Sequence, residues 1–255
     1  MNEEAWTAVS AIATAAAFLV VSWQAILTRK ALDLSQGVAL DAAWARLDNG
    51  APQVSVHLED PKWPLWAHSQ HGMPCNEWPR GHQWHFPRDE WQSLVLQAVV
   101  VVENRSSRQI KGRFEGDLIV EQDARPVAAP SPVLIPAADG DTPHVMRVYL
   151  QKTLTAKELS ENHLADEAGQ DLPHRAVGTI TLHDDRDNGV VDTWTISLTG
   201  CPLRPHENLG NVWVEVGDNL TGDPGRRSLT YERLPNRKRT YWVSRERGVP
   251  LGPHG

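Results

Sequence analysis

Cysteine and positive charge are both scarce in this sequence. It has two cysteines, Cys75 and Cys201, among 255 residues. A domain held together by disulfides needs more cysteines in a shorter chain, so that class is excluded and two free thiols are expected. Lys and Arg together number 25 against 32 Asp and Glu, which gives a formal net charge of -7. This balance argues against a specific nucleic-acid-binding protein, because such proteins carry a positive surface.

The common catalytic signatures are also missing. The chain contains no GxxxxGK(S/T) phosphate loop, no GxGxxG fingerprint, no GxSxG nucleophile elbow and no HExxH zinc motif. Ser, His and Asp are plentiful, but a catalytic triad is defined by geometry and not by their presence in a sequence. The sequence therefore assigns no catalytic residues and favours a non-enzymatic protein, with a metal-dependent enzyme as an alternative.

The longest uncharged run, from Trp6 to Leu27, covers 22 residues. As a helix rising ~1.5 Å per residue it reaches ~33 Å, which is enough to cross a bilayer core of ~30 Å. Trp6 and Trp23 lie near its ends, where tryptophan favours the membrane interface. We therefore expect a transmembrane helix over 6–27 that anchors the chain in the lipid bilayer. A buried, alanine-rich helix is the alternative.

Charged residues beside this run set the expected orientation. Glu3 and Glu4 precede it, whereas Arg29 and Lys30 follow it at once. The positive-inside rule then places the N-terminus outside the cell membrane and the C-terminal domain in the cytoplasm.

Residues 28–50 keep a helical pattern and predict a stalk that continues the membrane helix, with a break near Gly37 and an end at the "NGAP" of 49–52. One face of this stalk is apolar, with Leu32, Leu40, Ala43, Trp44 and Leu47. Such a face predicts either self-association with a second copy or packing against the domain that follows.

From Pro52 onward the sequence is a series of short apolar or alternating runs separated by turn residues. The run at 93–106 predicts a strand buried on both faces, with 111–122 as its neighbour. Further strands are predicted at 53–58, 131–136, 144–150, 211–216, 228–234 and 239–244. Roughly nine or ten strands with few helices between them favour an antiparallel β-sandwich, immunoglobulin-like or a partly closed barrel.

Two local motifs are sharper than the rest of this pattern. Thr155 stands three residues before Glu158, which is the capping box of a helix start, and Gly169 is placed to end that helix. Asn188 and Gly189 separate two alternating runs, 176–185 and 190–198, and predict a β-hairpin. The predicted divisions are an N-terminus outside the membrane (1–5), a transmembrane helix (6–27), a stalk (28–50), a β-sandwich domain (51–222) and basic C-terminal strands with a tail (223–255).

The stretch between the first two predicted strands gathers histidine, cysteine and tryptophan. Zinc takes four nitrogen or sulfur ligands, and the candidates for such a site are His68, His71, Cys75, His82 and His85. Tryptophan rings can also stack on a sugar, a base or a peptide, and the candidates for such a surface are Trp63, Trp66, Trp78, Trp84 and Trp91. The alternative is a long loop whose rings close one end of the sandwich with a small core of their own.

The C-terminal residues 223–255 form the one basic region, with eight Lys or Arg against three acids. Near-surface positive charge can contact anionic lipid headgroups or another anion. The candidate contacts are Arg226, Arg227, Arg237, Lys238 and Arg239. A solvated edge strand protected by charge is the alternative.

These patterns lead to one main hypothesis and two alternatives. The main hypothesis is a single-pass membrane protein whose cytoplasmic β domain is a non-enzymatic binding, scaffold or sensor module. Its partners are the lipid bilayer through 6–27 and a protein, or a second copy, through the stalk. The alternatives are a zinc-binding enzyme or sensor that uses the His/Cys cluster of 68–85, and an exported domain that binds glycans through the tryptophans.

Overall fold

The computed structural model describes residues 3–61, 65–79, 81–184, 189–216 and 229–242. Side chains before Ala16, apart from Thr14, are not described. The chain divides into two units, Met1–Gly50 and Ala51–Gly255, and each is a separate body of the molecule.

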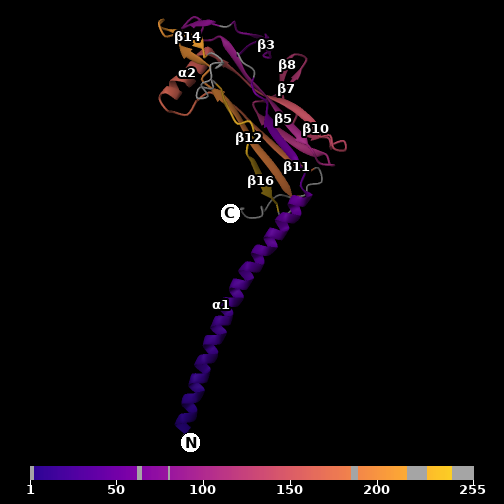
Figure 1. The fold of residues 1–255 in the computed structure, drawn as a ribbon, viewed down its shortest axis with the longest axis vertical. Coiled ribbons are helices and arrows are strands. Elements are labelled where there is room, and N and C mark those ends of the chain that lie inside the picture. The colour runs from indigo at the N-terminus through magenta and orange to yellow at the C-terminus, as the bar shows by residue number, and fades with distance from the viewer. Residues whose placement is uncertain (1–2, 62–64, 80, 185–188, 217–228, 243–255) are drawn as a thin grey trace. The chain divides into compact units, whose positions relative to one another are not determined.

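The first unit is one helix, α1 (Glu3–Gly50), and it is drawn as a continuous coil in Figure 1. The predicted break near Gly37 is wrong, because the helix continues through this position. One glycine in a helix interior costs only about 1 kcal/mol, which the helical residues on both sides offset. The helix ends at Gly50, where the "NGAP" motif predicted its end.

The predicted membrane localisation is not supported by the described part of α1. Within the described residues, no helix combines the length and apolarity that a bilayer crossing requires. This finding overturns the prediction of a single-pass protein with its N-terminus outside and its C-terminal domain in the cytoplasm.

The second unit is mainly β and consists of antiparallel sheets, as predicted. The first, sheet A, has the strand order β3-β2-β5-β10-β7-β8, with β1 beside β5 on the same edge as β2. Its strands are β1 (Val54–Leu58), β2 (Trp66–His68), β3 (Pro74–Glu77), β5 (Ser93–Asn104), β7 (Leu118–Gln122), β8 (Arg125–Ala128) and β10 (His144–Thr155). Strands β5 and β10 pair along their whole length and form its centre.

The second sheet, sheet C, has the order β15-β12-β11-β6-β9, with β16 also beside β12. Its strands are β6 (Ile110–Gly116), β9 (Val133–Ile135), β11 (Ala176–Asp184), β12 (Val190–Gly200), β15 (Leu229–Tyr231) and β16 (Arg237–Tyr241). Strands β11 and β12 form the predicted hairpin, and the three residues Trp194, Ile196 and Leu198 share its buried face. The turn residues 185–188 lie outside the described residues.

The two sheets pack face to face in a β-sandwich-like arrangement, with β5 and β10 in one layer and β11 and β12 in the other (Figure 1). Alternate side chains of both sheets point into one apolar core. Among the fully buried ones are Leu96, Leu150, Ile180 and Leu198. Each such side chain contributes about 1.5–3 kcal/mol by its removal from water.

One predicted strand, 111–122, is in fact two strands that belong to different sheets. The chain leaves sheet C at Gly116 and enters sheet A at Leu118. Gly116 has a φ of +84°, and a Cβ there would lie 2.4 Å from the Val177 carbonyl oxygen, so this corner requires glycine. Asp117 holds the corner, since its carboxylate accepts a hydrogen bond from the Val177 amide at 2.8 Å. The crossing places β7 beside β10.

A small sheet and one helix complete the unit. The small sheet has the order β13-β14-β4, from β4 (Gln83–His85), β13 (Leu203–Pro205) and β14 (Val212–Glu215). The helix α2 (Ala156–Glu167) begins with the predicted capping box, in which the Thr155 hydroxyl accepts from the Glu158 amide. Asn162 on this helix is fully buried and donates to the carbonyls of His174 and Gly200. These bonds attach α2 to the ends of β11 and β12.

Candidate functional site

The outer face of sheet A, which points away from the core, carries a pocket. In β5 the residues that face the core alternate with Val95, Gln97 and Val99, which face outward. Val99 lies opposite Tyr149 of β10 in the strand register. The floor of the pocket is therefore a row of outward side chains from the two central strands.

The hairpin β2–β3 covers part of this outer face. Val95 faces outward and is nevertheless 0% exposed. The turn of the hairpin reaches across β5, because the Gly72 carbonyl accepts a hydrogen bond of 3.0 Å from Gln151 on β10. The Gln151 side-chain oxygen in turn accepts a hydrogen bond of 2.8 Å from the Gln97 side-chain amide. These hydrogen bonds connect the floor of the pocket on β5 and β10 to the β2–β3 hairpin that covers it. Strands β2 and β3 thus extend sheet A and also enclose space above it.

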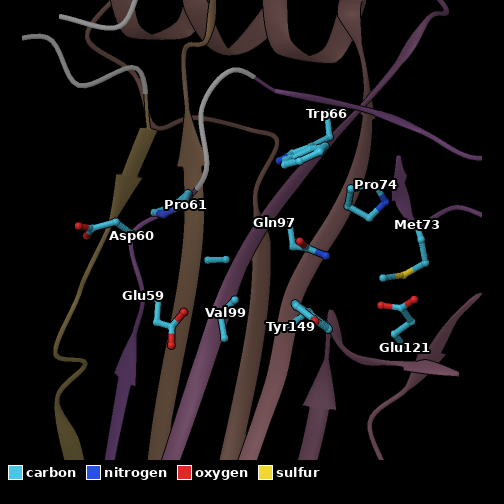
Figure 2. A pocket seen from close by; sticks show the side chains of 11 residues that line it. Glu59, Asp60, Pro61, Trp66, Met73, Pro74, Gln97, Val99, Glu121 and Tyr149 are labelled. Atoms are coloured by element: carbon cyan, nitrogen blue, oxygen red, sulfur yellow. The ribbon is translucent and has the colours of Figure 1, made fainter. Parts of the chain in front are cut away.

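Two further segments form the sides of the pocket. The end of β1 contributes Glu59, Asp60 and Pro61, and β7 contributes Glu121 (Figure 2). The enclosed volume is about 330 Å³. We call this space the sheet A pocket; its lining is Glu59, Asp60, Pro61, Trp66, Met73, Pro74, Gln97, Ala98, Val99, Glu121 and Tyr149. Figure 2 shows Trp66 above Gln97, with Tyr149 and Glu121 on the opposite side from Asp60.

The lining is acidic. Three carboxylates contribute to it, and among the described lining residues there is no Lys, Arg or His. The Glu59 carboxylate is 3.6 Å from the guanidinium of Arg147, which is exposed and lies outside the lining. The Asp60 carboxylate accepts a hydrogen bond of 2.6 Å from the Tyr231 hydroxyl. Within the described part of the chain Glu121 has no ion pair. Of the three lining carboxylates, Glu59 is the one with an ion pair among the described residues.

Of the five tryptophans predicted as a binding surface, one lines this pocket. Trp66 does so, whereas Trp78 and Trp84 pack on His82 between them, with ring centroids 4.6 Å from it. Trp84 is 1% exposed and lies in the core. Trp91 is 66% exposed and stands under the Lys157 ammonium at 5.2 Å. The fifth, Trp63, lies outside the described residues, as does its neighbour Lys62.

The five predicted metal ligands are spread over different surroundings. His68 bonds the neighbouring Ser69 carbonyl, and the Cys75 thiol bonds the Ala67 carbonyl across β2–β3. His82 packs between tryptophan rings, and His85 pairs with Val212 in the small sheet. The fifth candidate, His71, is exposed. Nowhere in the described structure do three His, Cys, Asp or Glu side chains stand ready to hold one metal ion.

The predicted anion contacts at the C-terminus also lie in different surroundings. Arg239 makes two hydrogen bonds of 2.7 Å to the buried Asp192, and Arg237 is 3.9 Å from the same carboxylate. Lys238 is exposed beside them on β16. Arg226 and Arg227 lie outside the described residues. Part of the basic charge of this region is therefore paired with a buried carboxylate of sheet C.

The second cysteine is not a nucleophile at neutral pH. Burial, and to a smaller extent the charge of Asp166, raises the pKa of the Cys201 thiol to about 11. A thiol of this pKa stays protonated, and the thiolate is the reactive form. Its Sγ is instead 3.5 Å from the Asn162 carbonyl oxygen.

No protein family matches the chain, and neither a characterised protein nor a solved structure is similar to it. Of the residues that line this candidate pocket, the sequence had singled out Trp66 and had not singled out Glu59, Asp60, Gln97, Glu121 and Tyr149. One signal was available, because Gln97 is the one polar residue in the stretch 94–102 of β5.

Proposed function

We propose that the β domain is a non-enzymatic binding module and that it takes its ligand in the sheet A pocket. The observation that carries this proposal is the hydrogen-bonded hairpin β2–β3, which holds Trp66, Met73 and Pro74 over an outer sheet face. A volume of 330 Å³ lies at the lower end of the range of ligand pockets, about 300–1,000 Å³, and suits a small molecule or a single side chain of a partner. The immunoglobulin-like sandwich or partly closed barrel stays a prediction beside it.

The described lining contains no Ser, Thr, Cys, Lys or His, the residue types most often used as nucleophiles or bases, and this favours binding over catalysis. Its carboxylates could act as an acid–base pair on a glycoside, so this activity needs a direct test. Turnover of nitrophenyl glycosides by the full-length protein, with loss of that turnover in Glu121→Gln, would overturn the proposal.

Binding itself is tested with fluorine NMR on the full-length chain labelled with 5-fluorotryptophan. The resonance of Trp66 is assigned by its loss in Trp66→Phe, and that of Trp91 by its loss in Trp91→Phe. The probes are butylammonium, 1-butanol, butanoate and methyl glucoside. We expect at least one probe to shift the Trp66 resonance in a saturable way and to leave exposed Trp91 unchanged. No saturable shift at Trp66 with any probe contradicts the proposal.

We also propose that α1 pairs with a second copy of the chain. The residues of the predicted stripe that lie near its end, Ala43, Trp44 and Leu47, are partly buried. The opposite side of the helix carries another apolar stripe at spacings of seven and four, Leu27, Leu34 and Val38, and these three side chains are exposed. Exposed apolar stripes of this kind are covered in coiled coils.

Sedimentation of the full-length protein tests this pairing. We expect a dimer for the wild type, a monomer for Leu34→Glu, and a dimer for Ser35→Glu, which places the same charge beside the stripe. A monomeric wild type, or equal dissociation of both variants, contradicts the pairing.

A further inference from the structure

We propose that the ligand of the sheet A pocket is a positively charged nitrogen on an alkyl stem, namely an alkylammonium group. This inference rests on the proposed function and adds the chemical class of the ligand. Such a group occurs on a lysine side chain of a partner protein and on a free polyamine, and the chemistry is the same in both.

The first argument is the hydrogen-bonding inventory of the pocket. The carboxylates of Glu59, Asp60 and Glu121 accept hydrogen bonds and donate none. The Gln97 amide already donates to Gln151, while its carbonyl oxygen has no partner among the described residues. Tyr149 adds one hydroxyl to the described lining.

This set of acceptors selects among ligands. A sugar hydroxyl both donates and accepts, and although it can donate to these carboxylates, its own oxygen meets few donors in the described lining. An ammonium group carries three donors and no acceptor, so it matches the lining. The same lining repels an anion, because it contains three carboxylates, and the Arg147 guanidinium that pairs with Glu59 lies outside the lining.

The second argument is the apolar part of the lining. Trp66, Met73 and Val99 come from the cover and from the floor, so an alkyl stem between them contacts apolar atoms on both sides. The faces of Trp66 and Tyr149 also attract a cation through their ring quadrupoles. Figure 2 shows these two rings on opposite sides of Gln97, with carboxylates on both flanks. The alkyl stem thus contacts apolar side chains, and the ammonium charge lies near aromatic faces and carboxylates.

The third argument is that the polar floor is already in place. The hydrogen bonds from Gln97 to Gln151 and from Gln151 to Gly72 fix the amide plane of Gln97. Gln151 is 8% exposed, so this chain is shielded from competing water. A fixed acceptor loses less entropy when a ligand binds than a mobile one does.

The test compares probes of equal length and different charge on the full-length, 5-fluorotryptophan-labelled protein. Butylammonium, 1-butanol and butanoate share their alkyl chain and carry a positive charge, no charge and a negative charge. We expect butylammonium to bind about tenfold more tightly than 1-butanol, from contact with several carboxylates and an aromatic face. Added salt should weaken only the butylammonium complex, because salt screens charge.

Two charge-removing variants locate the effect. Glu121→Gln should weaken butylammonium binding about two- to fivefold and leave 1-butanol unchanged. Glu115→Gln removes the same charge from β6 on the outer face of sheet C and should change neither probe. Equal effects of the two variants would show that net charge, and not the pocket, attracts the ligand, and would overturn the inference.

The remaining outcomes separate the two proposals. Equal or tighter binding of 1-butanol, butanoate or methyl glucoside at Trp66 overturns the alkylammonium assignment and leaves the binding module standing. No response of Trp66 to any probe removes both. Two further probes identify the source: preferential binding of the peptide acetyl-Gly-Lys-Gly-amide indicates a protein side chain, and preferential binding of spermidine indicates a free polyamine. Either result supports the assigned class.

Discussion

The two halves of the tryptophan-rich segment, residues 66–91, use similar residues for different purposes. In the first half, Trp66 stands at the edge of a solvent-open pocket and the hairpin that carries it is tied down through Gln151. In the second half, Trp84 is buried against His82 and Trp78, and its strand β4 pairs with β14. Both strands are supported by another element, but Trp66 lines a pocket whereas Trp84 fills the core.

This contrast also explains why composition alone misleads here. Large rings contribute most stability when they are buried, and a segment with many of them is drawn into the core by default. Phe86 and Trp213 stack at a centroid distance of 5.8 Å and extend the buried half. The exposed half needs polar anchors, and these are the glutamines of β5 and β10.

The largest effect on stability is expected from a substitution in the buried half of the tryptophan-rich segment. Trp84→Ala should lower the free energy of unfolding by about 3–5 kcal/mol, because it empties the space of a ring that is 1% exposed. Trp91→Ala, at an exposed ring, should change it by less than about 1 kcal/mol. Urea denaturation of both full-length variants measures the difference. Similar losses in the two variants would show that Trp84 does not serve as a core residue.

A smaller effect is expected at the anchor of the open half. Gln151→Ala removes the hydrogen bonds to Gln97 and Gly72 and should cost about 1–2 kcal/mol. Hydrogen exchange should become faster in residues 69–74 and stay unchanged in 83–85. Unchanged exchange in the hairpin turn would mean that the glutamine does not hold it.

Acid should affect the buried half through Asp89. The neighbouring Arg88 guanidinium, with help from the His85 amide, lowers the pKa of Asp89 from 3.8 to about 2. Because folding lowers this pKa, the ionised Asp89 carboxylate stabilises the folded state. This contribution to the free energy of unfolding is complete above about pH 4 and is lost as the pH falls toward 2. The stability difference between wild type and Asp89→Asn should therefore shrink between pH 4 and pH 2 in urea titrations. A difference that stays constant over this range contradicts the role of the carboxylate.

The smallest expected effect on stability is at the pocket carboxylates. Glu121→Gln and its control Glu115→Gln should each change the unfolding free energy by less than about 0.5 kcal/mol, because both side chains are exposed. Butylammonium binding should nevertheless differ between them. A large loss of stability in Glu121→Gln would mean that this carboxylate is needed for folding.

Local patterns predicted the parts of the fold that depend on neighbouring residues. The capping box at Thr155, the hairpin of β11 and β12, and the apolar strand β5 all formed as expected. Long-range pairing was not predictable in the same way. The β2–β3 cover depends on Gln151, about eighty residues further along the chain, and the split at Gly116 depends on the backbone of Val177.

The site was less predictable than the fold for the same reason. Its charged residues come from the end of β1 and from β7, and its floor comes from β5 and β10. No spacing in the sequence connects Glu59 with Glu121, since only the crossing from sheet C to sheet A brings β7 beside β10. The predicted membrane localisation failed on a different point, because no helix among the described residues is both long and apolar enough to cross a bilayer.

The central claim is that ligand enters the sheet A pocket, and methionine methyl groups test it most directly. The chain has three methionines, so selective ¹³C-methyl labelling gives a simple NMR spectrum. Met73 lines the pocket and Met146 packs against the core of the sandwich. With assignments from Met73→Leu and Met146→Leu, butylammonium should shift the Met73 signal to saturation and leave Met146 unchanged. An unchanged Met73 signal, or equal shifts of both, would contradict the claim.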